Sequence, residues 1–211
     1  MTNSIYDQML SRIIKTGKGK LIFPADFTGL GSNESIRKAL SRLVKEKILL
    51  RLGQGIYLYP EYDPELGTLY PSTEDIAEAV ARQDKARIIP TGAQALYKLR
   101  LSQQVPMKLV YLTDGVRRMV KVGKNTITFK ITTPKKLAMQ GKVSALVIQA
   151  LQALGQKQVD DKVIKQIKKA LAKEDVNLLR HDAGLAPGWI ATILFSLFKE
   201  LNNAGMAENN G

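Results

Sequence analysis

The sequence predicts a protein of the α+β class with three parts: a small N-terminal α/β unit, a central α/β unit containing an antiparallel meander, and a helical C-terminal tail. Three observations indicate this fold. Helix-period segments within residues 1–47 are followed by two short β-rich runs, three strand-like runs separated by turns fill residues 107–132, and every periodic segment after Pro134 is helical. Because 211 residues are long for one domain, we place boundaries at 1–62, 63–135 and 136–211, with the tail packing on the central domain.

The N-terminal elements follow from apolar spacing and from glycine and proline breaks. A helix is expected over Ile5–Ile14, a short strand over Leu21–Phe23, a short helix over Pro24–Leu30, a helix from Ser32 to about Lys47, and strands over Ile48–Leu52 and Ile56–Tyr59. Gly53-Gln54-Gly55 supplies the hairpin turn, and residues 60–64 are interpreted as the beginning of a linker. This order of elements is that of a winged helix-turn-helix.

The helix that begins at Ser32 is the candidate recognition helix. Its apolar residues follow the i, i+3, i+4, i+7 pattern of a core-facing stripe, so its polar and cationic residues face away from the core. In helix-turn-helix proteins such a helix enters the DNA major groove, where Arg and Lys contact guanine or phosphate and Asn contacts adenine. The candidate DNA-binding residues on the helix and its hairpin are Asn33, Ser35, Arg37, Lys38, Ser41, Arg42, Lys45, Arg51, Gln54 and Tyr57.

The remaining elements are predicted in the same way. Helices are expected over Thr73–Gln83 and Thr91–Leu99, strands over Met107–Thr113, Val116–Val122 and Thr126–Thr132, and helices over Val143–Leu154, Asp160–Ala172, Glu174–Ala183 and Pro187–Leu201. Consecutive strands joined by short turns predict an antiparallel meander. The last helix carries Trp189, which we interpret as packing in the core or in a homodimer.

Positive charge is clustered along the chain, whose net charge is +13. The net charge is +6 over residues 1–60, −2 over 61–100, +8 over 101–142 and +1 over 143–211. Such clustering favours a polyanionic partner, most often nucleic acid. The second basic block predicts a second DNA-backbone surface, with an RNA surface or a dock for an acidic partner as alternatives. Its residues are Arg117, Arg118, Lys121, Lys124, Lys130, Lys135 and Lys136, followed by Lys142.

The residue inventory disfavours catalysis. The chain has no cysteine, and His181 is its single histidine, which excludes thiolate and histidine-cluster metal sites. The segment Gly17–Lys20 lacks P-loop spacing, and no Asp-x-Asp pair follows Gly31-Ser32. The carboxylate pairs Asp160-Asp161 and Glu174-Asp175 stand where helices begin, which favours capping. We therefore expect no catalytic residue, no metal and no cofactor. Without an apolar run of membrane-spanning length, we expect a cytoplasmic protein with no membrane partner.

Residues 4–60 resemble the N-terminal domain of AbiEi-type antitoxins, the transcriptional regulators of type IV toxin–antitoxin (abortive infection) systems. The matching stretches are Phe23–Phe27, Ser35–Leu43 and Arg51–Tyr57, and Ile88–Leu96 with Leu112–Gly115 is similar to the second domain of such proteins. The resemblance implies a recognition helix at Ser32–Lys47 and a wing at Arg51–Tyr57. It also implies a repressor that binds its own promoter, with a nucleotidyltransferase-like toxin encoded nearby that it need not contact.

The sequence thus predicts a sequence-specific DNA-binding repressor and antitoxin whose partner is double-stranded DNA. One alternative is a winged-helix adaptor that binds a protein instead of DNA. A nucleic-acid-processing enzyme is a weaker alternative, because only the charge favours it.

Overall fold

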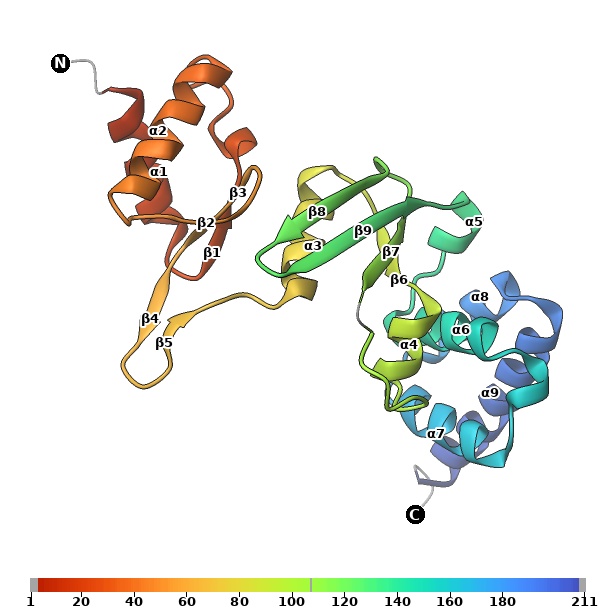
Figure 1. The fold of residues 1–211 in the computed structure, drawn as a ribbon. Helices are drawn as coiled ribbons and strands as arrows, with labels where there is room; N and C mark the ends of the chain where they lie inside the picture. Colours follow the sequence, from red (N-terminus) through yellow and green to blue (C-terminus); the bar gives the residue numbers. More distant parts are fainter. Residues whose placement is uncertain (1–3, 107, 209–211) are drawn as a thin grey trace. The chain divides into compact units, whose positions relative to one another are not determined.

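A computed structural model describes residues 4–106 and 108–208 of the chain and confirms the mixed α+β class (Figure 1). The chain forms two compact units: one contains the residues up to Ala86 together with Met119–Ile127, and the other contains Arg87–Arg118 and the residues from Thr128 onward. None of the described helices combines the length and the apolar character needed to cross a membrane.

The first unit opens with two helices over a small sheet. The elements are α1 (Ile5–Thr16), β1 (Lys20–Ile22), η1 (Pro24–Phe27), α2 (Asn33–Lys45), β2 (Leu50–Gly53) and β3 (Ile56–Tyr59). The strands pair antiparallel in the order β1-β3-β2, with Leu21 opposite Leu58 and Arg51 opposite Tyr57. The predicted elements are all present, although the short helix after Pro24 is a single 3₁₀ turn.

The core of this part is made by apolar side chains of the two helices and of η1. Met9 and Ile13 of α1 and Leu40 and Leu43 of α2 are fully buried and pack with Phe27 of η1. Burial of these side chains holds α2 against α1, and so decides which face of α2 meets solvent.

The residues expected to begin a linker instead form a hairpin. Strands β4 (Glu61–Asp63) and β5 (Gly67–Leu69) pair antiparallel, with Tyr62 opposite Thr68. One Asp63 carboxylate oxygen accepts hydrogen bonds from the backbone N–H groups of Glu65 and Leu66, each at 2.9 Å, and Gly67 has a φ of 75°. These local bonds close the turn that proline and aspartate only suggest. Helix α3 (Thr73–Gln83) follows, and the side chain of Ser72 caps it.

The central sheet corrects the predicted meander. Strands β6 (Ile88–Pro90), β7 (Leu109–Thr113), β8 (Arg118–Val122) and β9 (Asn125–Ile131) lie in the order β6-β7-β9-β8, so β7 and β8 are not neighbours. Strand β9 takes the place beside β7 because its Phe129 ring stacks on Tyr111 at 6.1 Å, and the Thr132 N–H donates to the Thr113 carbonyl at 3.0 Å. Met107, where a strand was expected to begin, lies outside the described residues.

The C-terminal residues are helical, as predicted. The second unit contains α4 (Gly92–Lys98), α5 (Pro134–Leu137), α6 (Lys142–Leu154), η2 (Gln156–Gln158), α7 (Asp161–Leu171), α8 (Val176–Leu185) and α9 (Gly188–Glu208). Helix α6 is the centre of the core, with Ile148 and Leu151 fully buried. Trp189 is partly buried against the same core, next to buried Ile190. This tryptophan therefore packs within the chain.

Candidate nucleic-acid interface

A side-chain cap determines where helix α2 begins, and its apolar stripe determines which side of the helix is buried. The hydroxyl of Ser32 accepts a hydrogen bond from the Ser35 backbone N–H at 3.2 Å, which satisfies one of the unpaired donors of the first turn. The Ser35 hydroxyl lies 2.9 Å from that of Ser32, so this side chain is engaged at the cap. With Ile36, Leu40 and Leu43 buried, the opposite side of the helix is fixed toward solvent.

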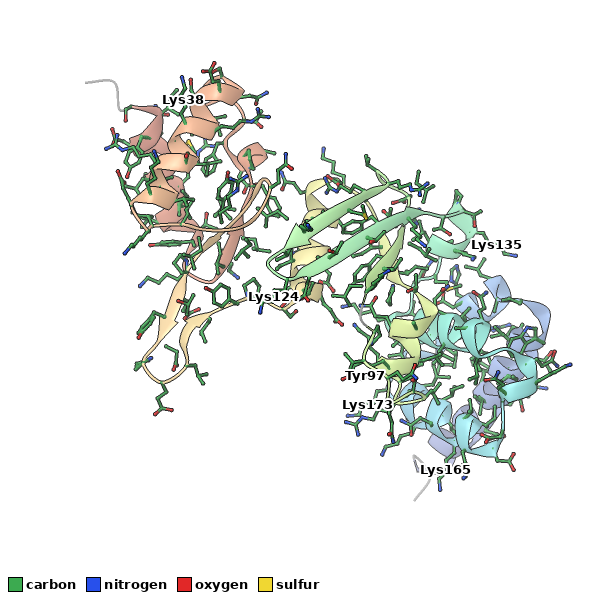
Figure 2. All side chains as sticks on the ribbon, in the orientation of Figure 1. Lys38, Tyr97, Lys124, Lys135, Lys165 and Lys173 are labelled. Carbon is green, nitrogen blue, oxygen red and sulfur yellow. The ribbon has the colours of Figure 1, made fainter. Side chains whose placement is uncertain are left out.

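The solvent face of α2 brings together most of the predicted contacts. At about 100° per residue, Lys38, Ser41 and Lys45 point directly away from the buried stripe, while Arg37 and Arg42 lie on its two flanks. The predicted contact residues of α2 that are exposed are Asn33, Arg37, Lys38, Ser41, Arg42 and Lys45 (Lys38 is labelled in Figure 2). The helix carries four basic residues and one acidic residue, so this face is cationic.

The acidic residue, Glu34, forms only a weak, exposed ion pair on this face. Its carboxylate lies 2.8 Å from the ammonium of Lys38, one turn along the helix, and both side chains are 77% exposed. Exposed pairs of this kind contribute about 0–1 kcal/mol, so a phosphate can replace the carboxylate at small cost. Among the described residues, Arg37 and Lys45 form no ion pair at all.

Arg42 is different, because two neighbours hold its guanidinium. Its Nε donates to Glu46 at 2.8 Å, and its Cζ lies over the Tyr6 ring of α1, 4.3 Å from the centroid. The Tyr6 hydroxyl in turn donates to the second oxygen of Glu46. These two hydrogen bonds lower the pKa of Glu46, and the bond to Glu46 raises the pKa of Tyr6. Sequence reasoning missed Tyr6 and Glu46; the i, i+4 spacing of Arg42 and Glu46 was the available signal.

The β2–β3 hairpin presents two of its three predicted contacts. Arg51 and Gln54 are exposed, whereas Tyr57 is only 8% exposed and belongs to the hydrophobic core. A side chain buried there is not offered to a ligand, so we leave Tyr57 out of the candidate interface. Alternation does not explain the difference, because Tyr57 lies directly opposite Arg51 and so shares its face of the sheet. The position of the strand explains it: β3 is the central strand, with Ile56, Tyr57 and Leu58 all buried, whereas β2 is an edge strand.

The turn between β8 and β9 contacts this hairpin within the same compact unit. The Gly123 N–H donates to the Leu52 carbonyl at 3.3 Å, and a Cβ on Gly53 would come within 2.4 Å of the Lys121 carbonyl oxygen. The contact brings Lys121 and Lys124, both exposed, to the neighbourhood of the hairpin.

The other members of the second basic block belong to the second compact unit. Lys130, Lys135, Lys136 and Arg117 are exposed there. Arg118 is half-buried, with its guanidinium carbon 5.8 Å from the centroid of the Phe129 ring, so it contributes to packing. The block is thus divided between two units.

A cavity of about 500 Å³ lies between β1, η1 and α3 in the first unit. Its carboxylates are engaged in backbone capping: Asp26 accepts from the Phe23 N–H at 2.7 Å and Asp75 from the Ser72 N–H at 3.1 Å. Burial raises the pKa of Asp26. Among the described residues no three His, Cys, Asp or Glu side chains converge in a metal-binding group.

Two carboxylates meet at the start of α6 in the second unit. Asp182 is fully buried and accepts hydrogen bonds from the Gln140 and Gly141 N–H groups, both at 2.9 Å, and from the Ser144 hydroxyl at 2.6 Å. Glu174 accepts from the Val143 and Ser144 N–H groups. The two acids therefore satisfy the unpaired donors of a helix whose own N-cap, Gly141, has no side chain.

The neighbouring His181 does not turn this cluster into a catalytic triad. Its Nδ1 lies 2.8 Å from Asp182, but the Ser144 hydroxyl also points at Asp182, so no base faces the hydroxyl. Asp160 and Asp175 cap α7 and α8 through their carboxylates, as expected of them. Each of these acids therefore has a structural partner.

Comparison with known families adds one decisive match. The model of a family of unknown function, DUF6088, matches residues 8–179, from α1 into α8. The chain belongs to the DUF6088 family. Every predicted contact residue of this DUF6088 protein lies inside the matched region, whereas α9 lies beyond it.

Other comparisons add little to the DUF6088 assignment. No curated protein matches the chain in sequence. The fold is distantly similar to the crystal structure of the RV2827C protein from Mycobacterium tuberculosis, with 11% identity and a TM-score of 0.43 over 92% of this chain and 82% of that one. A similarity this distant carries no functional argument.

Proposed function

We propose that this DUF6088 protein binds double-stranded DNA through α2 and the β2–β3 hairpin, used as the recognition helix and wing of a winged helix-turn-helix. The observation that carries the proposal is the division of α2 into a fully buried apolar stripe and an exposed cationic face. The order α1, β1, η1, α2, β2, β3 supports it further.

The geometry suggests a role for each side chain. Asn33 and Arg37 stand in the first turns of α2, the part of a recognition helix that reaches base edges. Lys38 and Lys45 are suited to phosphate contacts, which position the protein without reading sequence. Arg51 and Gln54 of the hairpin are suited to the adjacent backbone. Arg42, held by Tyr6 and Glu46, would present a fixed guanidinium beside them.

We further propose that the protein is a repressor of its own operon and the antitoxin of a type IV-like system. This step rests on the resemblance of residues 4–60 and 88–115 to AbiEi-type antitoxins. The partner in such a system is a nucleotidyltransferase-like toxin encoded nearby, and direct contact between the two proteins is not required. A reporter fused to the upstream region should be repressed by the wild-type chain and released by the interface variant described next.

Fluorescence anisotropy with a duplex from the upstream region tests DNA binding directly. The interface variant combines Arg37→Ala, Lys38→Ala and Lys45→Ala, and the matched control combines Lys165→Ala, Lys169→Ala and Lys173→Ala, which removes the same charge from exposed positions in the second unit. The interface variant should raise the Kd at least about tenfold, because loss of a base contact by Arg37 costs about 1–3 kcal/mol and the two lost lysines weaken binding further. Its log–log salt slope should fall by roughly 0.9 for each lost phosphate contact. Equal effects of the two variants, or no preference over shuffled DNA, would reject a specific role for α2.

A further inference from the structure

The β4–β5 hairpin carries apolar side chains that nothing in the described chain covers. Tyr62 is 71% exposed, Leu66 78% and Tyr70 66%. Figure 1 shows the hairpin extending away from α1 and α2 of the same unit. A two-stranded hairpin is marginally stable alone in water, and contiguous exposed apolar groups mark interaction sites. The hairpin therefore has the character of a docking element.

The two tyrosines lie on and next to the paired strands. Tyr62 of β4 lies opposite Thr68 of β5, and Tyr70 follows directly after the last residue of β5. Leu66 lies in the turn between the strands. The hairpin, with the residue that follows it, thus offers two exposed aromatic rings and an apolar tip to a partner.

The charge of the hairpin limits what the partner is. Residues 60–72, which contain the hairpin, have three carboxylates, Glu61, Asp63 and Glu65, and no lysine or arginine, in a chain whose net charge is +13. Such a segment is repelled by nucleic acid and by anionic lipid, and fits a basic protein surface that also has an apolar side chain.

A surface of that kind is present in the same compact unit. Met119 of β8 is 75% exposed, and Lys121 of the same strand and Lys124 of the β8–β9 turn are also exposed and form no ion pair among the described residues (Lys124 is labelled in Figure 2). Phosphate groups would leave Met119 uncovered, whereas methionine sulfur packs favourably on aromatic rings. The mixed character of this surface favours a protein partner.

We infer that the β4–β5 hairpin of one copy docks on the β8–β9 turn of a second copy. Each chain carries both the acidic hairpin with its exposed tyrosines and the basic surface, so the contact is self-complementary and can be made twice in a two-fold dimer. This contact does not depend on DNA binding. A hairpin covers much less than the ~800 Å² per partner of a standard interface, so the dimer should be weak, with a Kd in the micromolar range.

Sedimentation equilibrium without DNA tests the inference, over about 5–500 μM protein at low salt, a range chosen to bracket a weak interface. The wild-type weight-average mass should rise from monomer toward dimer. Tyr62→Ser with Tyr70→Ser should raise the dimer Kd at least about tenfold. The control Tyr97→Ser changes an exposed tyrosine of α4 in the other unit and should leave the Kd unchanged.

Charge-reversal variants test whether the hairpin of one copy contacts the β8–β9 turn of the second copy. Glu65→Lys and Lys124→Glu should each weaken the dimer, and their combination in one chain should restore it, because opposite charges then face each other again. Both side chains are exposed, and far-UV circular dichroism checks the fold of each variant. Three results would overturn the inference. The wild-type chain could stay monomeric at every concentration, or the tyrosine variant could dimerise with the wild-type Kd. The third is a double charge-reversal variant whose loss of dimer affinity equals the sum of the two single losses.

Discussion

The guanidinium carbon of Arg42 lies 4.3 Å from the centroid of the Tyr6 ring, and the Tyr6 hydroxyl donates to the carboxylate that also binds Arg42 Nε. One side chain of α1 thus orients a cation on the candidate recognition helix. The three residues Tyr6, Arg42 and Glu46 form one polar cluster across the two helices. This relationship leads to a prediction that separates positioning from simple electrostatics.

Replacing Glu46 by alanine should weaken DNA binding about threefold, a loss of less than 1.4 kcal/mol. The change removes a negative charge near α2, so electrostatics alone would tighten binding. Weakening is expected because Arg42 loses the carboxylate that aligns it. Anisotropy titrations at fixed salt measure the sign, and tighter binding by Glu46→Ala would contradict a positioning role.

The same cluster should make stability depend on pH in the acid range. The pKa of Glu46 is held below its ordinary value of 4.5 by the bonds from Tyr6 and Arg42. The stabilisation is therefore complete above pH 4.5 and is lost as the pH falls through the lowered value. Urea denaturation of the wild type and Glu46→Gln should differ near pH 6 and converge near pH 3. A constant difference at both pH values would count against this linkage.

Lys45→Ala should reduce DNA affinity without affecting the fold. Lys45 is exposed and unpaired among the described residues, so its removal should change the free energy of unfolding by no more than about 0.5 kcal/mol. The log–log salt slope of binding should fall by roughly 0.9. Titrations at several salt concentrations measure this slope, and an unchanged slope would show that Lys45 touches no phosphate.

Gly53→Ala should separate the β2–β3 hairpin from the β8–β9 turn. The new Cβ would come within 2.4 Å of the Lys121 carbonyl oxygen, a backbone atom that cannot rotate away. Overpacking of this kind costs about 1–3 kcal/mol, which thermal unfolding would detect. Gln54→Ala, at the next and exposed position, is the control and should unfold like the wild type.

Asp182→Asn should destabilise the second unit by about 2–4 kcal/mol, because a buried charged acceptor of several hydrogen bonds is replaced by a group that partly donates. Its partners at the start of α6 cannot be rehydrated, since Asp182 and Ser144 are both fully buried. His181→Ala changes an exposed ring and should cost much less. Denaturant titrations of the two variants give the comparison, and equal small losses would show that the cluster contributes little.

Local sequence signals account for the helices and for the exposed side of α2. The apolar spacing of Ile36, Leu40 and Leu43 determines which side of that helix is buried, and Ser32 determines where it begins. These signals are reliable because hydrophobic burial and capping act within a few residues along the chain.

Tertiary structure decided what depends on residues far apart in sequence. Four features join segments that are far apart in sequence: the order β7-β9-β8, the burial of Tyr57, the contacts of Tyr6 and Glu46 with Arg42, and the contact of the β8–β9 turn with Gly53. The longest of these separations is the 68 residues from Gly53 to Lys121. Strand periodicity predicts which face of the sheet a side chain lies on, but it does not predict which strands pair. Pairing depends on how the side chains of the assembled sheet pack. The sequence by itself therefore determined a cationic helix with one buried side, and only the assembled fold decided which of its cations are free and which are held.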